Sequence, residues 1–245
     1  MKKNKSEAQR IAAVSGIERK QYVKRMFNGI AKRYDLLNHL LSGGIDIYWR
    51  KKAISKLNPQ NGDRVLDLAC GTGDFAIESA KKADCSVIGA DIALEMLKLG
   101  ARKIEKKGSI SFVNADGEQL PLKSACMDGV TIAFGIRNMG VIADALREMN
   151  RILKKEGKAV ILEFSTPTST LFRKIYLFYF NKILPAIGRL VSKDPEAYRY
   201  LPESVGNFPS VENFVKLMVD SGFENIRYWN LLNGIAVIYR GEKGK

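Results

Sequence analysis

The sequence of 245 residues has a single histidine, His39, and only three cysteines, Cys70, Cys85 and Cys126. No two cysteines form a C-x-x-C pair, so the Cys and His residues do not have the spacing of a zinc site. We therefore expect no metal centre, and we interpret the cysteines as reduced, mostly buried thiols. His39 is either a catalytic base or a structural residue, and a lone histidine is more often structural.

Long hydrophobic runs are also missing. No stretch approaches the roughly 20 uninterrupted apolar residues of a membrane-spanning helix. The N-terminal segment MKKNKSEAQR is basic, but no apolar stretch follows it, so it does not resemble a secretory signal. Glu7 and Glu18 are unlike a transit peptide, which usually lacks acids. These absences predict a cytoplasmic protein.

The net charge of +14 is unevenly distributed along the chain. Residues 1–60 contain 14 Lys and Arg against 4 Asp and Glu, residues 61–170 contain 15 of each, and residues 171–245 contain 11 against 7. Basic ends around a neutral middle indicate an anionic partner, either nucleic acid or acidic lipid headgroups. A solubilising excess of positive charge explains the same distribution equally well.

Strand-like and helix-like segments alternate through the middle of the chain. Short, β-branched and almost continuously apolar segments predict strands at 64–69, 86–91, 109–115, 129–135 and 158–164, with helices at 74–83, 93–107 and 141–154. Strands that are apolar on both faces are typical of a parallel sheet. A helix over 210–221 is followed by a predicted antiparallel hairpin of 223–231 and 234–241. The pattern predicts an α/β fold with a doubly wound, mostly parallel sheet.

Two segments lie outside this alternation. Residues 1–57 are expected to form a basic helical extension packed on the core, with helices in 18–57 joined by SGGID. Residues 58–245 then form the main domain, with a helical insertion at about 168–209. Within the insertion, 168–191 is rich in Phe, Tyr, Leu and Ile with interspersed Arg and Lys, which is typical of an amphipathic segment at a membrane surface. Packing on the core or at a dimer interface explains the segment as well.

The stretch DLACGTGD, residues 67–74, places a glycine loop between a buried strand and a helix. Backbone N–H groups converge on a ligand at such a loop, and the spelling G-x-G-x-x-A fits the dinucleotide fingerprint. However, Asp67 and Asp74 flank the loop, and their carboxylates would repel a pyrophosphate. A cationic ligand without phosphate, such as S-adenosylmethionine, is therefore favoured over NAD.

Acids follow the next two predicted strands as well. Asp91, followed by Ile92, ends the second strand, where a carboxylate can accept both ribose hydroxyls. Asp116 and Gly117 follow the third strand, where a carboxylate and an N–H group can pair with the adenine edge. All these residues are expected at the carboxyl edge of the sheet, where α/β folds bind ligands. They predict a site for S-adenosylmethionine, which becomes S-adenosylhomocysteine on methyl transfer.

The motifs resemble those of a known family. VLDLACGTGDFA, GADIALEML and NADGEQLPL are similar to the first three motifs of class I methyltransferases, which implies a Rossmann-like fold. YDLLNHLLSGGIDIYW (34–49) and RILKKEGKAVILEFS (151–165) resemble the two signatures of the ubiquinone/menaquinone biosynthesis C-methyltransferases, and FGIRNM (134–139) and YRYLPESVGNFP (198–209) are also similar to that family. The resemblance extends from about residue 20 to the C-terminus.

The chain departs from the family pattern at three places. The signature usually has His where Asp46 stands, and Pro-Gly where Lys155-Glu156 stand. Ala133, at the end of the fourth predicted strand, occupies a position that is often Ser. None of these changes affects the glycine loop. The residues expected to bind the cofactor are Asp67, Gly71, Thr72, Gly73, Asp74, Asp91, Ile92, Asp116, Gly117 and Ala133.

The resemblance implies methyl transfer to a ring carbon of a prenylated hydroquinone, most simply demethylmenaquinol to menaquinol, with the benzoquinol of the ubiquinone pathway as a second acceptor. An aromatic carbon becomes nucleophilic when an adjacent hydroxyl loses its proton, which calls for a base or a cation. Arg137 would stabilise the phenolate, or form a structural salt bridge. Tyr34 and Asp35 would orient or deprotonate the quinol, or cap and pack the N-terminal helices. The residues expected to bind the quinol are Asn138, Tyr198 and Tyr200.

The expected partners follow from a substrate whose tail lies in the bilayer. We expect the protein to attach peripherally to the anionic inner face of the cytoplasmic membrane, and we leave a homodimer open. The alternative function is S-adenosylmethionine-dependent methylation of RNA or of another small molecule. Against a nucleic-acid partner, no Asn/Asp-Pro-Pro-aromatic segment follows the fourth predicted strand.

Overall fold

Seven strands form a single sheet in the computed structural model of the chain, which describes residues 6–104, 109–167, 178 and 195–244. The strand order is β3-β2-β1-β4-β5-β7-β6. All neighbouring pairs from β3 to β5 are parallel, whereas β7 is antiparallel to both β5 and β6. The predicted doubly wound, mostly parallel sheet is thus confirmed. The strand bounds are β1 Arg64–Leu68, β2 Ser86–Asp91, β3 Ile110–Asn114, β4 Met127–Ala133, β5 Leu153–Phe164, β6 Phe223–Leu231 and β7 Ala236–Lys243.

The predicted C-terminal hairpin is also confirmed. β6 and β7 pair antiparallel, with Leu231 opposite Ala236. A 3-10 turn over Leu232–Gly234 joins them, and Asn233 within it has a left-handed backbone with φ of 54°. Asparagine tolerates this conformation better than most residues, which explains why the chain reverses here.

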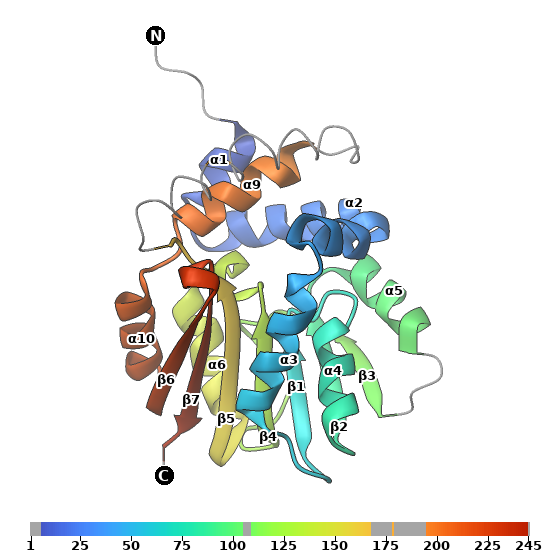
Figure 1. The fold of residues 1–245 in the computed structure, drawn as a ribbon, viewed down its shortest axis with the longest axis vertical. Helices are drawn as coiled ribbons and strands as arrows, with labels where there is room; N and C mark the ends of the chain where they lie inside the picture. Colours follow the sequence, from blue (N-terminus) through green and yellow to red (C-terminus); the bar gives the residue numbers. More distant parts are fainter. Residues whose placement is uncertain (1–5, 105–108, 168–177, 179–194, 245) are drawn as a thin grey trace.

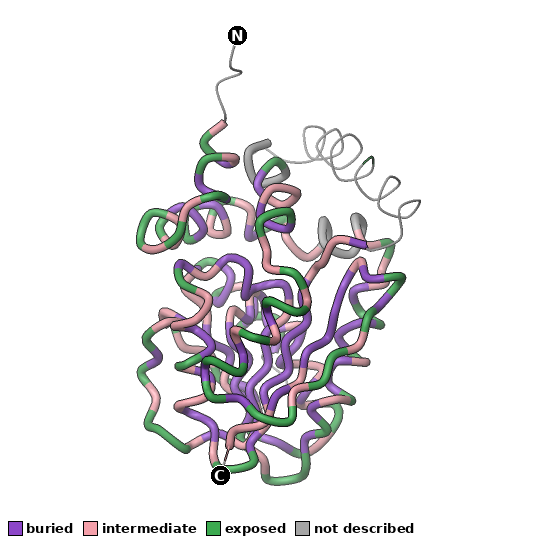
Figure 2. The backbone as a smooth tube through the Cα atoms, turned by 90° about the vertical axis from the view of Figure 1, so that its left-hand side faces the viewer, coloured by how far each residue is buried: buried purple, intermediate pink, exposed green. Residues whose placement is uncertain are grey.

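Helices cover both faces of the sheet (Figure 1). On one face, α3 (Ile45–Leu57), α4 (Asp74–Lys82) and α5 (Leu94–Ile104) bury apolar side chains such as Trp49, Phe75 and Ile104 against the strands. On the other face, α6 (Ile142–Ile152) and α10 (Val211–Asp220) do the same with residues such as Leu146 and Phe214. Figure 2 shows that buried residues are concentrated in the strands between these two layers.

A third layer lies over the carboxyl ends of the parallel strands. The long helix α2 (Ile17–Ser42) runs across this edge, and α1 (Glu7–Ala12) and α9 (Pro195–Gly206) lie above it (Figure 1). α1 begins with a capping box, because Ser6 Oγ accepts the N–H of Gln9 and the Gln9 side chain accepts the N–H of Ser6. Tyr22 of α2 packs on Tyr200 of α9 with ring centroids 5.5 Å apart. The N-terminal helices and α9, which precedes α10 in the chain, thereby build a single cover over the sheet edge.

The segments that lay outside the predicted alternation are only partly described. The helices expected in 18–57 are α2 and α3, and the turn between them contains Gly43 and Gly44, both with positive φ. α3 lies on the sheet face itself, beside α4. The amphipathic segment 168–191 lies outside the described residues, with the exception of Phe178.

Candidate active site

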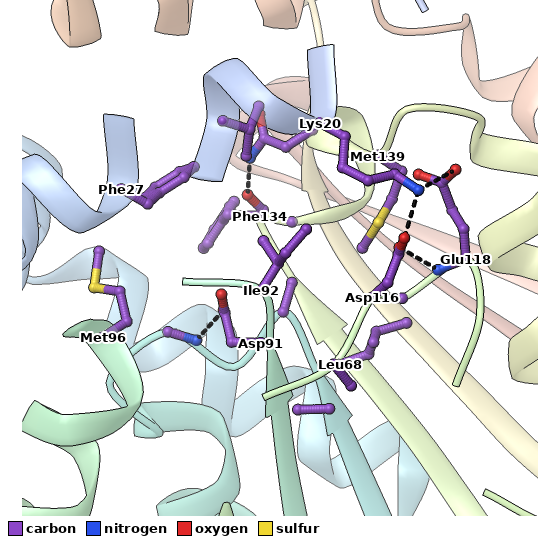
Figure 3. A pocket seen from close by; sticks show the side chains of 18 of the residues that line it. Lys20, Phe27, Leu68, Asp91, Ile92, Met96, Asp116, Glu118, Phe134 and Met139 are labelled. Atoms are coloured by element: carbon purple, nitrogen blue, oxygen red, sulfur yellow. Dashed lines mark hydrogen bonds and ion pairs between the residues drawn. The ribbon is translucent and has the colours of Figure 1, made fainter. Parts of the chain in front are cut away.

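A cavity lies at the carboxyl edge of the sheet, beneath α2 (Figure 3). Residues at the strand ends, among them Leu68, Asp91 and Asp116, form its floor, and Lys20 and Phe27 of α2 contribute its roof. The space measures about 680 Å³, the part open to solvent included. This is the region of an open α/β sheet in which ligands generally bind.

Strained backbone borders the cavity. Ala69 directly after β1 and Phe134 directly after β4 have positive φ values of 49° and 57°, and both line the space. For residues other than glycine such conformations cost about 1–3 kcal/mol and concentrate at functional sites. The Phe134 turn is fixed by its N–H, which donates to the carbonyl oxygen of Leu162 at 2.7 Å. The strained turns after β1 and β4 therefore form part of the cavity wall.

Asp91 holds the glycine loop in place. Its Oδ2 accepts the N–H of Gly71 at 2.8 Å, and its Oδ1 accepts the N–H of Ala93 at 2.7 Å. Burial raises the pKa of Asp91, and these backbone donors oppose the shift because they stabilise the carboxylate. Gly71 has a φ of +56°, which favours glycine at this turn. The loop and the carboxylate at the end of β2 thus form one unit.

Asp116 is linked to the roof of the cavity. Its Oδ2 lies 2.5 Å from Nζ of Lys20, whose Nζ also lies 3.1 Å from Oε2 of Glu118 (Figure 3). The other carboxylate oxygen of Asp116 accepts the N–H of Glu118 at 3.0 Å. Desolvation alone would lower the pKa of Lys20, but the two carboxylates outweigh it and raise the pKa. Lys20 therefore remains a cation at neutral pH.

A smaller chamber of about 310 Å³, the part open to solvent included, adjoins the cavity at the glycine loop. Tyr34, Gly71 and Ala133 line both spaces, so a ligand can extend from one into the other. Of the two spaces, Arg50 of α3 lines only the smaller chamber, and its side chain is 8% exposed. It forms an ion pair with Asp46, four residues earlier on the same helix.

Asp67 lies in the wall of this smaller chamber and is 1% exposed. Its Oδ2 accepts the N–H of Ala76 at 2.9 Å, and its Oδ1 lies 3.2 Å from the Thr131 hydroxyl. Burial raises the pKa of Asp67 to about 7, even though Thr131, Ala76 and the nearby Arg50 all lower it. Of the two acids that flank the glycine loop, Asp67 is thus the one buried under it.

Asp74, the second flanking acid, has a cationic partner within the protein. Lys103 of α5 places Nζ 2.6 Å from Asp74 Oδ1 and 2.7 Å from Asp35 Oδ2. The Thr72 hydroxyl donates to Asp35 Oδ1 at 2.5 Å. Desolvation lowers the pKa of Lys103, and the two carboxylates raise it by more. The sequence pattern showed the acid on the loop but not this compensating lysine.

Most of the residues expected to bind a cofactor border one of the two spaces. Gly73 borders neither. It precedes α4 with a φ of +84°, and a Cβ atom there would lie 2.9 Å from Cζ of Phe112. The larger cavity is lined by Gly71, Asp91, Ile92, Asp116, Gly117 and Ala133, and the smaller chamber by Asp67, Gly71, Thr72, Asp74 and Ala133.

The three expected catalytic residues do not lie together. Tyr34 lines both spaces, whereas Asp35 is bound to Thr72 and Lys103. Arg137 is 7% exposed and lines neither space; its Nη1 lies 2.8 Å from Glu163 Oε1. The structural salt bridge that the sequence left open for Arg137 is therefore present.

The expected quinol-binding residues also occupy different surroundings. Asn138 lines the larger cavity, and its buried Oδ1 has no hydrogen-bond partner within the described part of the chain. Tyr200 is 1% exposed, packs on Tyr22 and lines neither space. The backbone of Tyr198 belongs to α9, but its side chain lies outside the described part of the chain.

Sequence reasoning missed Lys20, Phe27 and Arg50. Each belongs to a helix that precedes the sheet in the chain, and its position depends on how that helix crosses the sheet. A local motif gives no signal for such a contact. Tyr34, on the same helix as Lys20, was found only because it falls in a family-like segment.

Neither a metal-binding cluster nor a membrane-spanning helix is present among the described residues. No group of three or more His, Cys, Asp and Glu side chains there could hold a metal ion. No described helix combines the length and the apolar character that crossing a bilayer requires.

Comparison of the sequence with known proteins gives a match over almost its whole length. Residues 16–243 match the ubiE/COQ5 methyltransferase family. A protein of Geotalea uraniireducens, named ubiquinone/menaquinone biosynthesis C-methyltransferase UbiE, is 48% identical over 231 residues, which cover 92% of this chain and 98% of the relative.

Solved structures with the same fold have much lower sequence identity. A SAM-dependent methyltransferase of Thermotoga maritima, described as a possible histamine N-methyltransferase, is 20% identical with a TM-score of 0.65, over 90% of this chain and 99% of that one. Phosphoethanolamine N-methyltransferase 2 of Haemonchus contortus, in complex with S-adenosyl-L-methionine, is 14% identical with a TM-score of 0.61, over 80% of this chain and 52% of that one. At these identities the likeness shows the fold alone.

Proposed function

Because the chain belongs to the ubiE/COQ5 methyltransferase family, we propose that it transfers a methyl group from S-adenosylmethionine to a ring carbon of a prenylated hydroquinone in ubiquinone or menaquinone biosynthesis. The observation that carries the proposal is the match over residues 16–243 together with an acid-lined cavity at the carboxyl edge of the sheet. The family match supplies the reaction class. The acid-lined cavity supplies a site whose negative charge fits the positively charged methyl donor.

The residues around the cavity fit S-adenosylmethionine. Asp91 would accept the ribose hydroxyls, and Asp116 with the N–H of Gly117 would pair with the adenine edge. Asp67 and Asp74 lie on the glycine-loop side, which suits the positively charged methionine end and would repel a pyrophosphate. The bound cofactor supplies a methyl group on a positively charged sulfur.

The protein's own task is to align the acceptor ring and to favour its phenolate form. We propose that Tyr34 orients the reacting hydroxyl, because its side chain borders both spaces. Asp35 would hold this part of α2 through Thr72 and Lys103. For Arg137 we propose stabilisation of the phenolate, which requires its guanidinium to exchange part of its contact with Glu163 for the acceptor oxygen.

Asn138 is proposed to bind the acceptor directly. Its Oδ1 is buried at the cavity and unpaired within the described part of the chain, and a buried acceptor without a partner costs about 1–3 kcal/mol. A ring hydroxyl can donate to this oxygen. Tyr198 and Tyr200 of α9 are proposed to pack against the quinol ring or its prenyl tail. Neither tyrosine is among the described residues that line the larger cavity.

The acceptor proposed first is demethylmenaquinol, with the ubiquinone-pathway benzoquinol second. The prenyl tail of either quinol lies in a bilayer, so the enzyme must reach a membrane surface. We propose peripheral attachment to the anionic inner face of the cytoplasmic membrane, supported by 14 Lys and Arg against 4 Asp and Glu in residues 1–60. Each basic residue near such a surface contributes about 1 kcal/mol.

In the decisive experiment, the purified protein is incubated under reducing conditions with methyl-labelled S-adenosylmethionine and one of the two prenylated quinols. The product is identified by mass spectrometry. We expect a label on the ring carbon of at least one quinol. S-adenosylhomocysteine is titrated in parallel. If S-adenosylhomocysteine binds normally but neither quinol is methylated, the assignment of a quinol as acceptor is wrong, whereas the assignment as a methyltransferase stands. Methylation of added RNA would favour the alternative function, an RNA methyltransferase.

A further inference from the structure

The outer side of helix α3 carries positive charge without compensating acids. The single acid of this helix, Asp46, is buried and paired with Arg50, whereas its three lysines are exposed or half-buried. Beside α3, the edge strand β6 adds an exposed arginine (Figure 1). We call these four residues the basic face: Lys51, Lys52, Lys56 and Arg227. Within the residues that the structure describes, none of the four pairs with a carboxylate.

Two aromatic rings lie in the basic face, each next to a lysine. Nζ of Lys56 lies 4.3 Å from the centroid of the Trp229 ring, and Nζ of Lys52 lies 5.9 Å from that of Tyr48. Trp229 packs against the apolar side of α3, so Arg227, two residues earlier in β6, lies on the same face of the sheet. Such pairs are typical of a membrane–water interface, where the ring enters the interface and the ammonium stays among the headgroups.

Apolar side chains are exposed where this face meets the carboxyl edge of the sheet. Ile47, in the first turn of α3, is exposed, and so is Leu232 in the turn between β6 and β7. Leu232 has a φ of 43°, a backbone conformation that is unfavourable for leucine. Neither backbone preference nor burial explains a leucine at this position. The position therefore favours a contact with a partner.

The opposite face of the sheet is not basic in this way. α6 and α10 together carry four acidic and three basic residues, and Arg147 and Arg151 each pair with an acid on α6 itself. On the α3 side, the acids Glu224 and Glu242 lie toward the other end of β6 and β7, and Arg240 pairs with Glu242. Of the two faces, the α3 side thus carries the excess of unpaired positive charge within the described residues.

We propose that the basic face docks the protein on an anionic lipid bilayer, with its cations among the headgroups and Ile47, Tyr48 and Leu232 in the interface. The inference rests on the proposed quinol acceptor, because a substrate dissolved in a bilayer requires the cavity edge of the enzyme to approach that bilayer. Ile47 and Leu232 lie at this edge. A nucleic acid fits less well, because it makes no use of exposed aliphatic side chains and each ring has a lysine where a base would stack.

The test measures co-sedimentation with vesicles made of equal parts of phosphatidylglycerol and phosphatidylcholine, beside vesicles of phosphatidylcholine alone. We expect the wild-type protein to bind the anionic vesicles, less strongly as the salt concentration rises, and not the neutral ones. In Lys51→Gln/Lys52→Gln/Lys56→Gln, binding to the anionic vesicles should weaken roughly 100-fold, because three cations near the surface are lost. Absence of binding by the wild-type protein would overturn the inference.

A matched variant controls for total charge. Lys123→Gln/Lys155→Gln/Lys216→Gln removes three exposed lysines outside the basic face and lowers the net charge by the same amount. It should bind the anionic vesicles within about threefold of wild type, since these lysines are not expected near the headgroups. Equal weakening in the two triple variants would show that the charge of the whole protein matters and not this face, and would overturn the inference.

The fluorescence of Trp229 gives an independent measurement that needs no lysine variant. The other tryptophan of the chain, Trp49, is buried. Anionic vesicles with acyl chains brominated near the headgroup should quench part of the emission, and this part should be missing in Trp229→Phe, which should still bind. If vesicles bind without quenching of Trp229, a different surface contacts the bilayer and the inference is wrong.

These measurements contain no quinol, so they separate docking from the proposed function. If the protein methylates a quinol analogue with a short, soluble tail but binds no vesicle, only the docking inference is wrong. If it docks through the basic face but methylates no quinol, only the proposed acceptor is wrong. A single-stranded RNA oligonucleotide is the competing partner. If the wild-type protein binds this RNA more tightly than the anionic vesicles and the lysine variant of α3 loses that binding, the basic face binds nucleic acid and the inference is overturned.

Discussion

Lys20 and Asp116 join the roof of the cavity to its floor, with Nζ and Oδ2 2.5 Å apart. Lys20 lies near the start of α2, and Asp116 follows β3, so the contact spans 96 residues of sequence. At the other end of the roof, Asp35 of the same helix contacts Thr72 and Lys103. α2 is therefore fixed at two points across the place where the adenosyl group is expected.

The first prediction is that Lys20→Met loosens this roof. Asp116 keeps lone pairs for the adenine edge, so the main effect is the loss of the ion pair, whose partners are partly exposed and whose value is about 1 kcal/mol or less. We expect S-adenosylhomocysteine to dissociate roughly up to five-fold faster, measured by stopped-flow fluorescence. Lys24→Met, at an exposed position of the same helix, is the matched control. Tighter binding in Lys20→Met would mean that Lys20 competes with the ligand for Asp116.

The second prediction concerns Asp91. Asp91→Ala removes the acceptor for the N–H groups of Gly71 and Ala93 as well as the proposed ribose contact, so S-adenosylhomocysteine binding should be lost in calorimetry. Asp91→Asn keeps one acceptor oxygen and should retain weak binding. Asp84→Ala, an exposed acid before β2, is the control and should bind as wild type does. Undiminished binding in Asp91→Ala would remove Asp91 from the site.

The strands and the strand-end acids could be predicted because their signals are local. β1 and β2 are short, mostly apolar runs, and Asp91 is the last residue of β2, whereas Asp116 comes two residues after β3. Parallel strands bring such ends to one edge, whatever the details of packing. This is why Asp91 and Asp116 line one cavity.

The compensating cations could not be predicted in the same way. Lys103 occupies the last turn of α5, where a basic residue is common because it interacts favourably with the helix dipole. Nothing in the sequence shows that it reaches Asp74 and Asp35. Arg50 likewise reads as one of several basic residues on α3. Their roles depend on the angles at which α5 and α3 cross the sheet, and those angles are set by tertiary packing.

The third prediction is that the buried carboxyl of Asp67 makes the unliganded protein less stable as the pH rises. Its pKa is about 7 in the folded protein, compared with the ordinary value of 3.8 for an aspartate in an unfolded chain. Between these values the folded state binds more protons than the unfolded state, so the free energy of unfolding falls with rising pH, by up to about 4 kcal/mol, and levels off above pH 7.

The variant that tests this is Asp67→Asn. Asparagine can accept the Ala76 N–H and donate to Thr131 Oγ1, which lies 3.3 Å from the carbonyl oxygen of Leu66 and can donate there. Urea unfolding at pH 5 and pH 8 should show that the variant gains stability relative to wild type mainly at pH 8. Its affinity for S-adenosylhomocysteine should fall, because the negative wall of the smaller chamber is lost. A stability difference that is the same at both pH values would contradict the raised pKa.

The fourth prediction separates the structural role of Arg137 from the catalytic one. Arg137→Met leaves Glu163, which is fully buried, without its cation, and breaking a buried pair in this way costs about 3–5 kcal/mol. In Arg137→Met/Glu163→Gln the residual charge is gone and the glutamine oxygen can accept the N–H of Phe164, whereas the N–H of residue 137, which donates to Glu163 Oε2 at 3.2 Å, loses its acceptor. Part of the stability should therefore return in urea unfolding, less the cost of about 1–3 kcal/mol for the unpaired N–H. If Arg137 also stabilises the phenolate, turnover of the quinol should remain about 100-fold or more below wild type, with S-adenosylhomocysteine affinity unchanged. Recovery of turnover along with stability would show that Arg137 serves only to fix the turn after β4.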